Sequence, residues 1–173
     1  YRFVDLDRYG DHDLLAERPF SYVRYYRNDG TREEAAFVEA ADTIRDTEGR
    51  AIFSDRQNIP NATDIDGDGQ MDLLIGRLEG TVTRYEETGT DENGVPEFEL
   101  VTDRFEGIEI VAQIGSLHGA NTMALGDIDD DGDEDLFWGD YFEPGILFLE
   151  NTGSPTRPNF RGEPLPFPTQ EPV

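Results

Sequence analysis

The chain has 173 residues, and acidic side chains dominate its composition: 39 Asp and Glu face 14 basic residues, for a formal net charge of −25 at pH 7. Such a surface repels nucleic acids and anionic membranes, because both need a basic face to attract them. Cysteine and apolar runs of membrane-spanning length are absent, which excludes disulfides, thiolate metal sites and direct membrane insertion.

Three acidic segments of nine residues divide the chain into repeats of about 60 residues. We call them loop 1 (5–13), loop 2 (64–72) and loop 3 (127–135), and number their residues from position 1 to position 9. In each repeat an aromatic residue, a glycine and a phenylalanine follow in the same order, which chance in an acidic chain does not explain. These landmarks are Tyr26, Tyr85 and Phe148; Gly30, Gly89 and Gly153; and Phe37, Phe98 and Phe160.

Short β-strands are predicted in every repeat. A short apolar run follows each loop, at 14–15, 73–75 and 136–138. After a turn comes a run rich in aromatic and β-branched residues, at 22–26, 81–85 and 146–149, and both kinds of run are typical of strands. The segment 33–45 is compatible with a helix or with a strand and a loop.

A unit of about 60 residues with several short strands has the size of a propeller blade. We therefore predict an all-β fold of about three blades, with repeat 1 at 1–58, repeat 2 at 59–121 and a partial repeat 3 at 122–162. A β-sandwich accounts for the strands but not for the repeat. Because three blades cannot close a ring, we expect a fragment of a larger propeller, completed by further blades or by neighbouring subunits.

Proline crowds the end of the chain. Since proline cannot donate to a β-ladder, we predict an extended, irregular tail at 163–173. This tail is either an exit linker or a segment that lies on a neighbour.

Loops 2 and 3 carry the oxygen ligands of a calcium site. Calcium takes about six to eight oxygens, and without a cation such closely spaced carboxylates would repel one another. Asp at positions 1, 3, 5 and 9 supplies carboxylates, and Gly at position 6 permits the turn that presents the carbonyl of position 7. The predicted metal ligands are Asp64, Asp66, Asp68, Asp72 and the backbone oxygen of Gln70, and Asp127, Asp129, Asp131, Asp135 and the backbone oxygen of Asp133.

Loop 1 departs from this pattern, because Tyr9 stands at position 5. The acidic residues that remain make it a weaker candidate for a third calcium site, with a side chain at position 7 as a further donor. An EF-hand is excluded, because position 12 is apolar in all three segments where that motif requires Glu. The weaker candidate ligands are Asp5, Asp7, Asp11 and Asp13.

The motif D-x-D-x-D-G-x-x-D-L, with an apolar strand and a later N-T-G-like turn, resembles the FG-GAP/VCBS repeats, from Phe3 to about Phe160. The resemblance implies β-propeller blades whose loops bind calcium, as in integrin α subunits and in bacterial secreted or surface proteins. The Phe-Gly and Gly-Ala-Pro landmarks of integrins are not clear in this chain. The bacterial type is therefore the better match.

We predict no catalytic residues within this sequence. Nucleophile elbows, phosphate-binding loops and zinc motifs are absent, and Ser116 and His118 lack the strand-turn-helix context of a nucleophile. The predicted function is a calcium-binding module for protein or glycan interaction and adhesion, at an extracellular, cell-surface or periplasmic location, with structural calcium. Two alternatives are a non-catalytic region of a larger secreted enzyme, such as a polysaccharide lyase, and a structural subunit of a multi-protein assembly.

Overall fold

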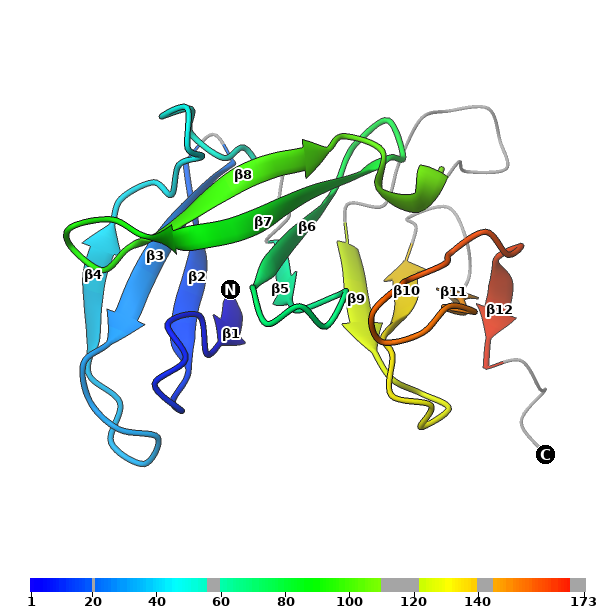
Figure 1. Cartoon of the computed structure of the whole chain (residues 1–173), viewed down its shortest axis with the longest axis horizontal. Helices are drawn as coiled ribbons and strands as arrows, with labels where there is room; N and C mark the ends of the chain where they lie inside the picture. The colour runs from blue at the N-terminus through cyan, green and yellow to red at the C-terminus, as the bar shows by residue number, and fades with distance from the viewer. Residues whose placement is uncertain (20, 56–59, 110–121, 140–144, 169–173) are drawn as a thin grey trace.

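The computed structural model describes residues 1–19, 21–55, 60–109, 122–139 and 145–168, and these form three four-stranded antiparallel sheets (Figure 1). Within each sheet, the strands pair in chain order. The first sheet contains β1 (Arg2–Val4), β2 (Asp13–Arg18), β3 (Tyr22–Asn28) and β4 (Phe37–Ala41). The second contains β5 (Asn61–Thr63), β6 (Asp72–Gly76), β7 (Val82–Thr90) and β8 (Pro96–Thr102). The third contains β9 (Thr122–Gly126), β10 (Asp135–Gly139), β11 (Ile146–Leu149) and β12 (Leu165–Phe167).

The prediction of an all-β fold is confirmed, since each sheet is the four-strand antiparallel meander of a propeller blade. In the described part of the chain, the helical structure is one 3-10 turn, η1 (Phe105–Gly107). The segment 33–45, whose composition was ambiguous, contains strand β4 and irregular chain.

The second sheet is covered on both faces, and this explains the continuous apolar run in its second strand. All five residues of β6 are buried. Successive side chains of a strand point to opposite faces, so Leu73 and Ile75 pack with the first sheet, whereas Leu74 packs with the third. The β-sandwich alternative has two packed sheets, whereas here the second sheet packs between two others.

The innermost strands of the three sheets converge on one carbonyl group. The side-chain amide of Asn61, in β5, donates to the carbonyl oxygen of Met123, in β9, at 3.0 Å. The guanidinium of Arg2, in β1, donates to the same oxygen at 3.4 Å. The acidic loops join the first two strands of each sheet, and in Figure 1 each loop lies at the lower end of the two strands that it joins.

The predicted irregular tail needs correction, because part of it is a strand. Residues 165–167 form β12, which pairs with β11 and gives the third sheet its fourth strand. Pro166 is compatible with this position because β12 is an edge strand, where a missing N–H costs no ladder hydrogen bond. The third unit therefore extends beyond the predicted boundary at residue 162.

The alignment of aromatic landmarks also needs a correction of one residue in the third repeat. Tyr26 and Tyr85 pair with the residue directly after position 9 of their loops, whereas Phe148 pairs with the second residue after it. The third hairpin contains one extra residue. By strand register, the equivalent residues are instead Tyr25, Arg84 and Phe148.

Candidate metal centres

The three acidic loops share one backbone conformation. The glycine at position 6 has φ of +89°, +89° and +92° in loops 1, 2 and 3, a region that favours glycine. Its amide donates to the carboxylate at position 1 at 3.0, 2.9 and 3.0 Å. Position 4 also has positive φ, at Arg8, Gly67 and Asp130. Loop 1 therefore keeps the fold of the other two in spite of Tyr9.

Position 9 ties each loop to the rest of its sheet. The residues at this position, Asp13, Asp72 and Asp135, are buried, and each accepts the backbone amide of position 2. In loops 1 and 3 the second oxygen accepts the backbone amide of Asn28 or Asn151, both at 2.8 Å. Position 9 was predicted as a metal ligand. The structure gives it a structural role as well, which the loop sequence alone does not reveal.

Loop 3 gathers carboxylates that have no cationic partner among the described residues. Oxygens of Asp127, Asp129 and Asp131 all lie within 4.8 Å of one another. Asp133 is only 5% exposed, and neither of its carboxylate oxygens has a hydrogen-bond partner. Burial, and then repulsion from Asp131 and the other loop carboxylates, raises the pKa of Asp133 to about 6. A donor set made only of oxygens, with unsatisfied buried atoms, fits a hard cation such as calcium.

Loop 2 has a similar cluster, but it contains an arginine. Oxygens of Asp64, Asp66 and Asp72 lie within 4.8 Å of one another. Arg84, in β7, contacts Asp72 through Nε at 2.6 Å and Asp66 through Nη2 at 2.7 Å. Asp68 is not part of this cluster; its Oδ1 accepts the amide of Gln70. Three of the four side chains predicted as ligands therefore lie together, and two of these three contact the guanidinium of Arg84.

Loop 1 brings its carboxylates less close together, yet leaves three buried oxygens unsatisfied. These atoms belong to Asp5, Asp7 and Asp11. Burial, and then the charge of Asp13, raises the pKa of Asp7. Tyr9 is 82% exposed, so its ring does not fill the space left by the missing carboxylate. The weaker candidate site thus keeps some unsatisfied oxygens of a cation site.

A family model described as an FG-GAP-like repeat matches residues 64–138, from the start of loop 2 to the fourth residue of β10. This segment is therefore similar to an FG-GAP-like repeat. Modules built from such repeats are of the propeller type, are generally non-catalytic and typically occur in extracellular or surface proteins. No curated protein and no solved structure matches the chain.

The FG-GAP-like segment contains two features that the motif does not predict. One is Arg84, a basic residue at the position where the first repeat has Tyr25. Aligning the hairpin β6–β7 with the hairpin β2–β3 by strand register reveals this difference. The other is the carboxylate of Asp133, which was predicted to offer only its backbone oxygen. The sequence offered one signal for this second feature: position 7 is acidic in loops 1 and 3 but not in loop 2.

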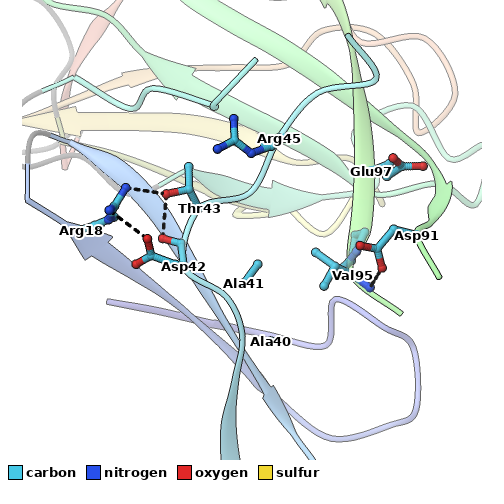
Figure 2. A pocket seen from close by; sticks show the side chains of 10 residues that line it. Arg18, Ala40, Ala41, Asp42, Thr43, Arg45, Asp91, Val95 and Glu97 are labelled. Atoms are coloured by element: carbon cyan, nitrogen blue, oxygen red, sulfur yellow. Dashed lines mark hydrogen bonds and ion pairs between the residues drawn. The ribbon is translucent and has the colours of Figure 1, made fainter. Parts of the chain in front are cut away.

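A polar cleft of about 490 Å³ lies between the first two sheets, and residues of the acidic loops do not line it (Figure 2). On one wall Arg18 pairs with Asp42 at 2.9 Å, and on the other Asp91 accepts the amide of Val95 at 2.9 Å. These groups offer donors and acceptors to a polar partner. Ser116 and His118 lie outside the described residues. Within the described part, no helix is long and apolar enough to cross a membrane.

Proposed function

We propose that this protein is a calcium-stabilised propeller module that binds protein or glycan partners outside the cytoplasm. The observation that carries the proposal is loop 3, where three carboxylates converge within 4.8 Å and the buried carboxylate of Asp133 has no partner among the described residues. Uncompensated carboxylates at this spacing are costly, and a bound cation removes that cost.

The proposed ligands in loop 3 are the carboxylates of Asp127, Asp129 and Asp131, with oxygens of Asp133 and Asp135. Calcium there would offset part of the negative charge of the loop and hold it against the strands, so its role is structural. All-protein oxygen sets favour calcium over magnesium, which prefers to keep its waters. If these loops have the affinity of extracellular modules, about 10⁻⁴–10⁻³ M, calcium fills them outside the cytoplasm and not inside it.

The outer face of the first sheet supports assembly with a neighbour. Phe3 and Phe37 are 58% and 40% exposed, with ring centroids 6.0 Å apart. The second sheet, by contrast, buries both faces against sheets of its own kind. We propose that a further blade or a neighbouring subunit covers this face, which also favours a structural subunit of an assembly as the second candidate function.

Calorimetric titration with calcium tests the proposed site. The wild-type chain is expected to bind calcium at loop 3 and to melt at a higher temperature in about 1 mM calcium than in EGTA. Asp131→Asn should weaken this binding by at least about tenfold, because it removes one charged ligand. Asp130→Asn is the matched control: it makes the same replacement of one carboxylate oxygen by an amide NH2, on an exposed side chain at position 4.

The proposal is overturned if the wild-type chain gives neither a calcium heat nor a shift in melting temperature. It is also overturned if Asp130→Asn and Asp131→Asn reduce calcium binding equally, since the effect would then come from net charge and not from the site.

A further inference from the structure

Arg84 is the one basic residue that forms ion pairs with loop carboxylates in the described part of the chain. Its side chain is only 10% exposed, and it contacts Asp66 at position 3 and Asp72 at position 9 of the same loop. Nη2 also contacts Glu86 at 2.8 Å, and the guanidinium lies 6.0 Å from the centroid of the Phe105 ring. The cation is thus held on several sides.

The other two repeats show what stands at this position when no arginine is present. In the first sheet the equivalent residue is Tyr25, whose hydroxyl donates to Asp13 at 3.0 Å. In the third sheet it is Phe148, which packs on Phe137 with ring centroids 5.2 Å apart and carries no polar group. Loops 1 and 3 therefore receive no positive charge from this register position.

We propose that Arg84 is the resident cation of loop 2, replacing the positive charge that loop 3 obtains from calcium. This inference rests on the proposed function, since it assigns the calcium of the module to loop 3 and withholds it from loop 2. Loop 2 then keeps its fold in calcium-free buffer, and its calcium affinity is at least about tenfold lower than that of loop 3.

Two physical effects produce this difference. A calcium ion near Asp66 and Asp72 would meet the positive charge of Arg84 at close range, in a partly buried environment where screening is weak. Moving Arg84 away would break three short ion pairs and leave the carboxylate of Asp72, which is 1% exposed, without its charged partner. Glu86 supplies a further negative charge that holds Arg84 in place.

A matched pair of substitutions tests the inference without altering Arg84. Asp68→Asn and Asp131→Asn change position 5 of loops 2 and 3, and in both loops the Oδ1 of this residue accepts the amide of position 7, as an Asn oxygen would. Calorimetric titration with calcium alone should show that Asp131→Asn weakens binding at loop 3 by at least about tenfold, so that one equivalent fewer binds with the wild-type affinity. Asp68→Asn should retain the wild-type stoichiometry and affinity.

Substitution of Arg84 provides the complementary gain of function. Arg84→Tyr introduces the residue of the first repeat, which can still donate a hydrogen bond to position 9 but carries no charge. This variant should bind one calcium more than the wild type, and Asp68→Asn in the same chain should abolish the additional site. In EGTA it should melt below the wild type and regain most of the loss with calcium. Arg84→Lys keeps the charge and should gain no site, and Arg104→Gln controls for net charge at an exposed pair.

The outcomes separate this inference from the proposed function. If Asp68→Asn removes one calcium equivalent from the wild-type chain, loop 2 binds calcium in the presence of Arg84 and the inference is wrong, while the calcium module stands. If Arg84→Tyr folds but gains no site, the inference is also overturned. If the wild type and Arg84→Tyr both bind no calcium, the proposed function itself fails.

Discussion

The carboxylate of Asp133 is buried and lies among the other acidic side chains of loop 3, and neither oxygen has a hydrogen-bond partner in the part of the chain that the structure describes. Its pKa is raised to about 6, mainly by burial and then by neighbouring carboxylates. A raised carboxyl pKa means that the folded chain binds this proton more tightly than the unfolded chain. The protonated carboxyl group therefore contributes to the free energy of unfolding. This contribution is complete at pH values below the pKa that Asp133 has in the unfolded chain, and it is lost as the pH rises through about 6.

We expect Asp133→Asn to separate this contribution in calcium-free buffer. Relative to the wild type, the variant should gain free energy of unfolding as the pH rises from about 4 to about 7, because it removes a charge that the fold penalises. Urea unfolding at several pH values measures the difference, with Asp130→Asn as an exposed neighbour for comparison. A difference between Asp133→Asn and wild type that does not change with pH would contradict the prediction.

Among the secondary-structure elements, β12 shows how a short edge strand completes a blade. Phe167 lies 5.3 Å from Phe137 and 6.1 Å from Phe148, between ring centroids. These aromatic contacts, and the pairing of three residues with β11, attach the Pro-rich segment to the third sheet. The third sheet therefore takes its fourth strand from residues that are separated from β11 by a long connection in the sequence.

Truncation of the aromatic contact should weaken the third sheet. Phe167→Ala is expected to lower the free energy of unfolding by about 1–2 kcal/mol, since it removes two aromatic pairs and part of the apolar burial. Leu165→Ala, on the same strand but 48% exposed, should cost less than about 1 kcal/mol. Urea denaturation of both variants measures the difference. Equal losses would show that β12 acts through its backbone pairing and not through the ring.

For the whole molecule, the acidic loops account for only part of the charge. They contain 15 of the 39 acidic residues, and the 24 that remain still outnumber the 14 basic residues. Repulsion across the surface therefore opposes folding independently of any metal site. This general term weakens as salt shortens the Debye length, from about 30 Å at 0.01 M to about 3 Å at 1 M.

Salt and calcium should therefore stabilise the protein separately. In EGTA, the melting temperature is expected to rise as sodium chloride increases from about 0.01 M to about 1 M. At fixed ionic strength, about 1 mM calcium should add a further rise that the same concentration of magnesium does not. Asp131→Asn should retain the salt effect and lose the calcium effect. If calcium and magnesium were equivalent, screening alone would explain the stabilisation.

Much of the fold and of the loops was predictable from the sequence, because the relevant signals are local. The glycine at position 6 permits the positive φ of each loop, and alternating carboxylates precede it within a few residues. Apolar runs such as 73–75 indicate strands, and the repeat of about 60 residues indicates blades. The sequence by itself therefore determined the all-β architecture, the three loops and their candidate ligands.

Tertiary structure decided which of those loops differ, because the deciding contacts join separate strands. Arg84 follows loop 2 by twelve residues, and only the pairing of β6 with β7 brings it to Asp72. Strand pairing likewise places residues 165–167 in the third sheet despite Pro166. Burial leaves the oxygens of Asp133 without partners. A nine-residue motif specifies the loop, but the neighbouring strands set the charge and burial around it.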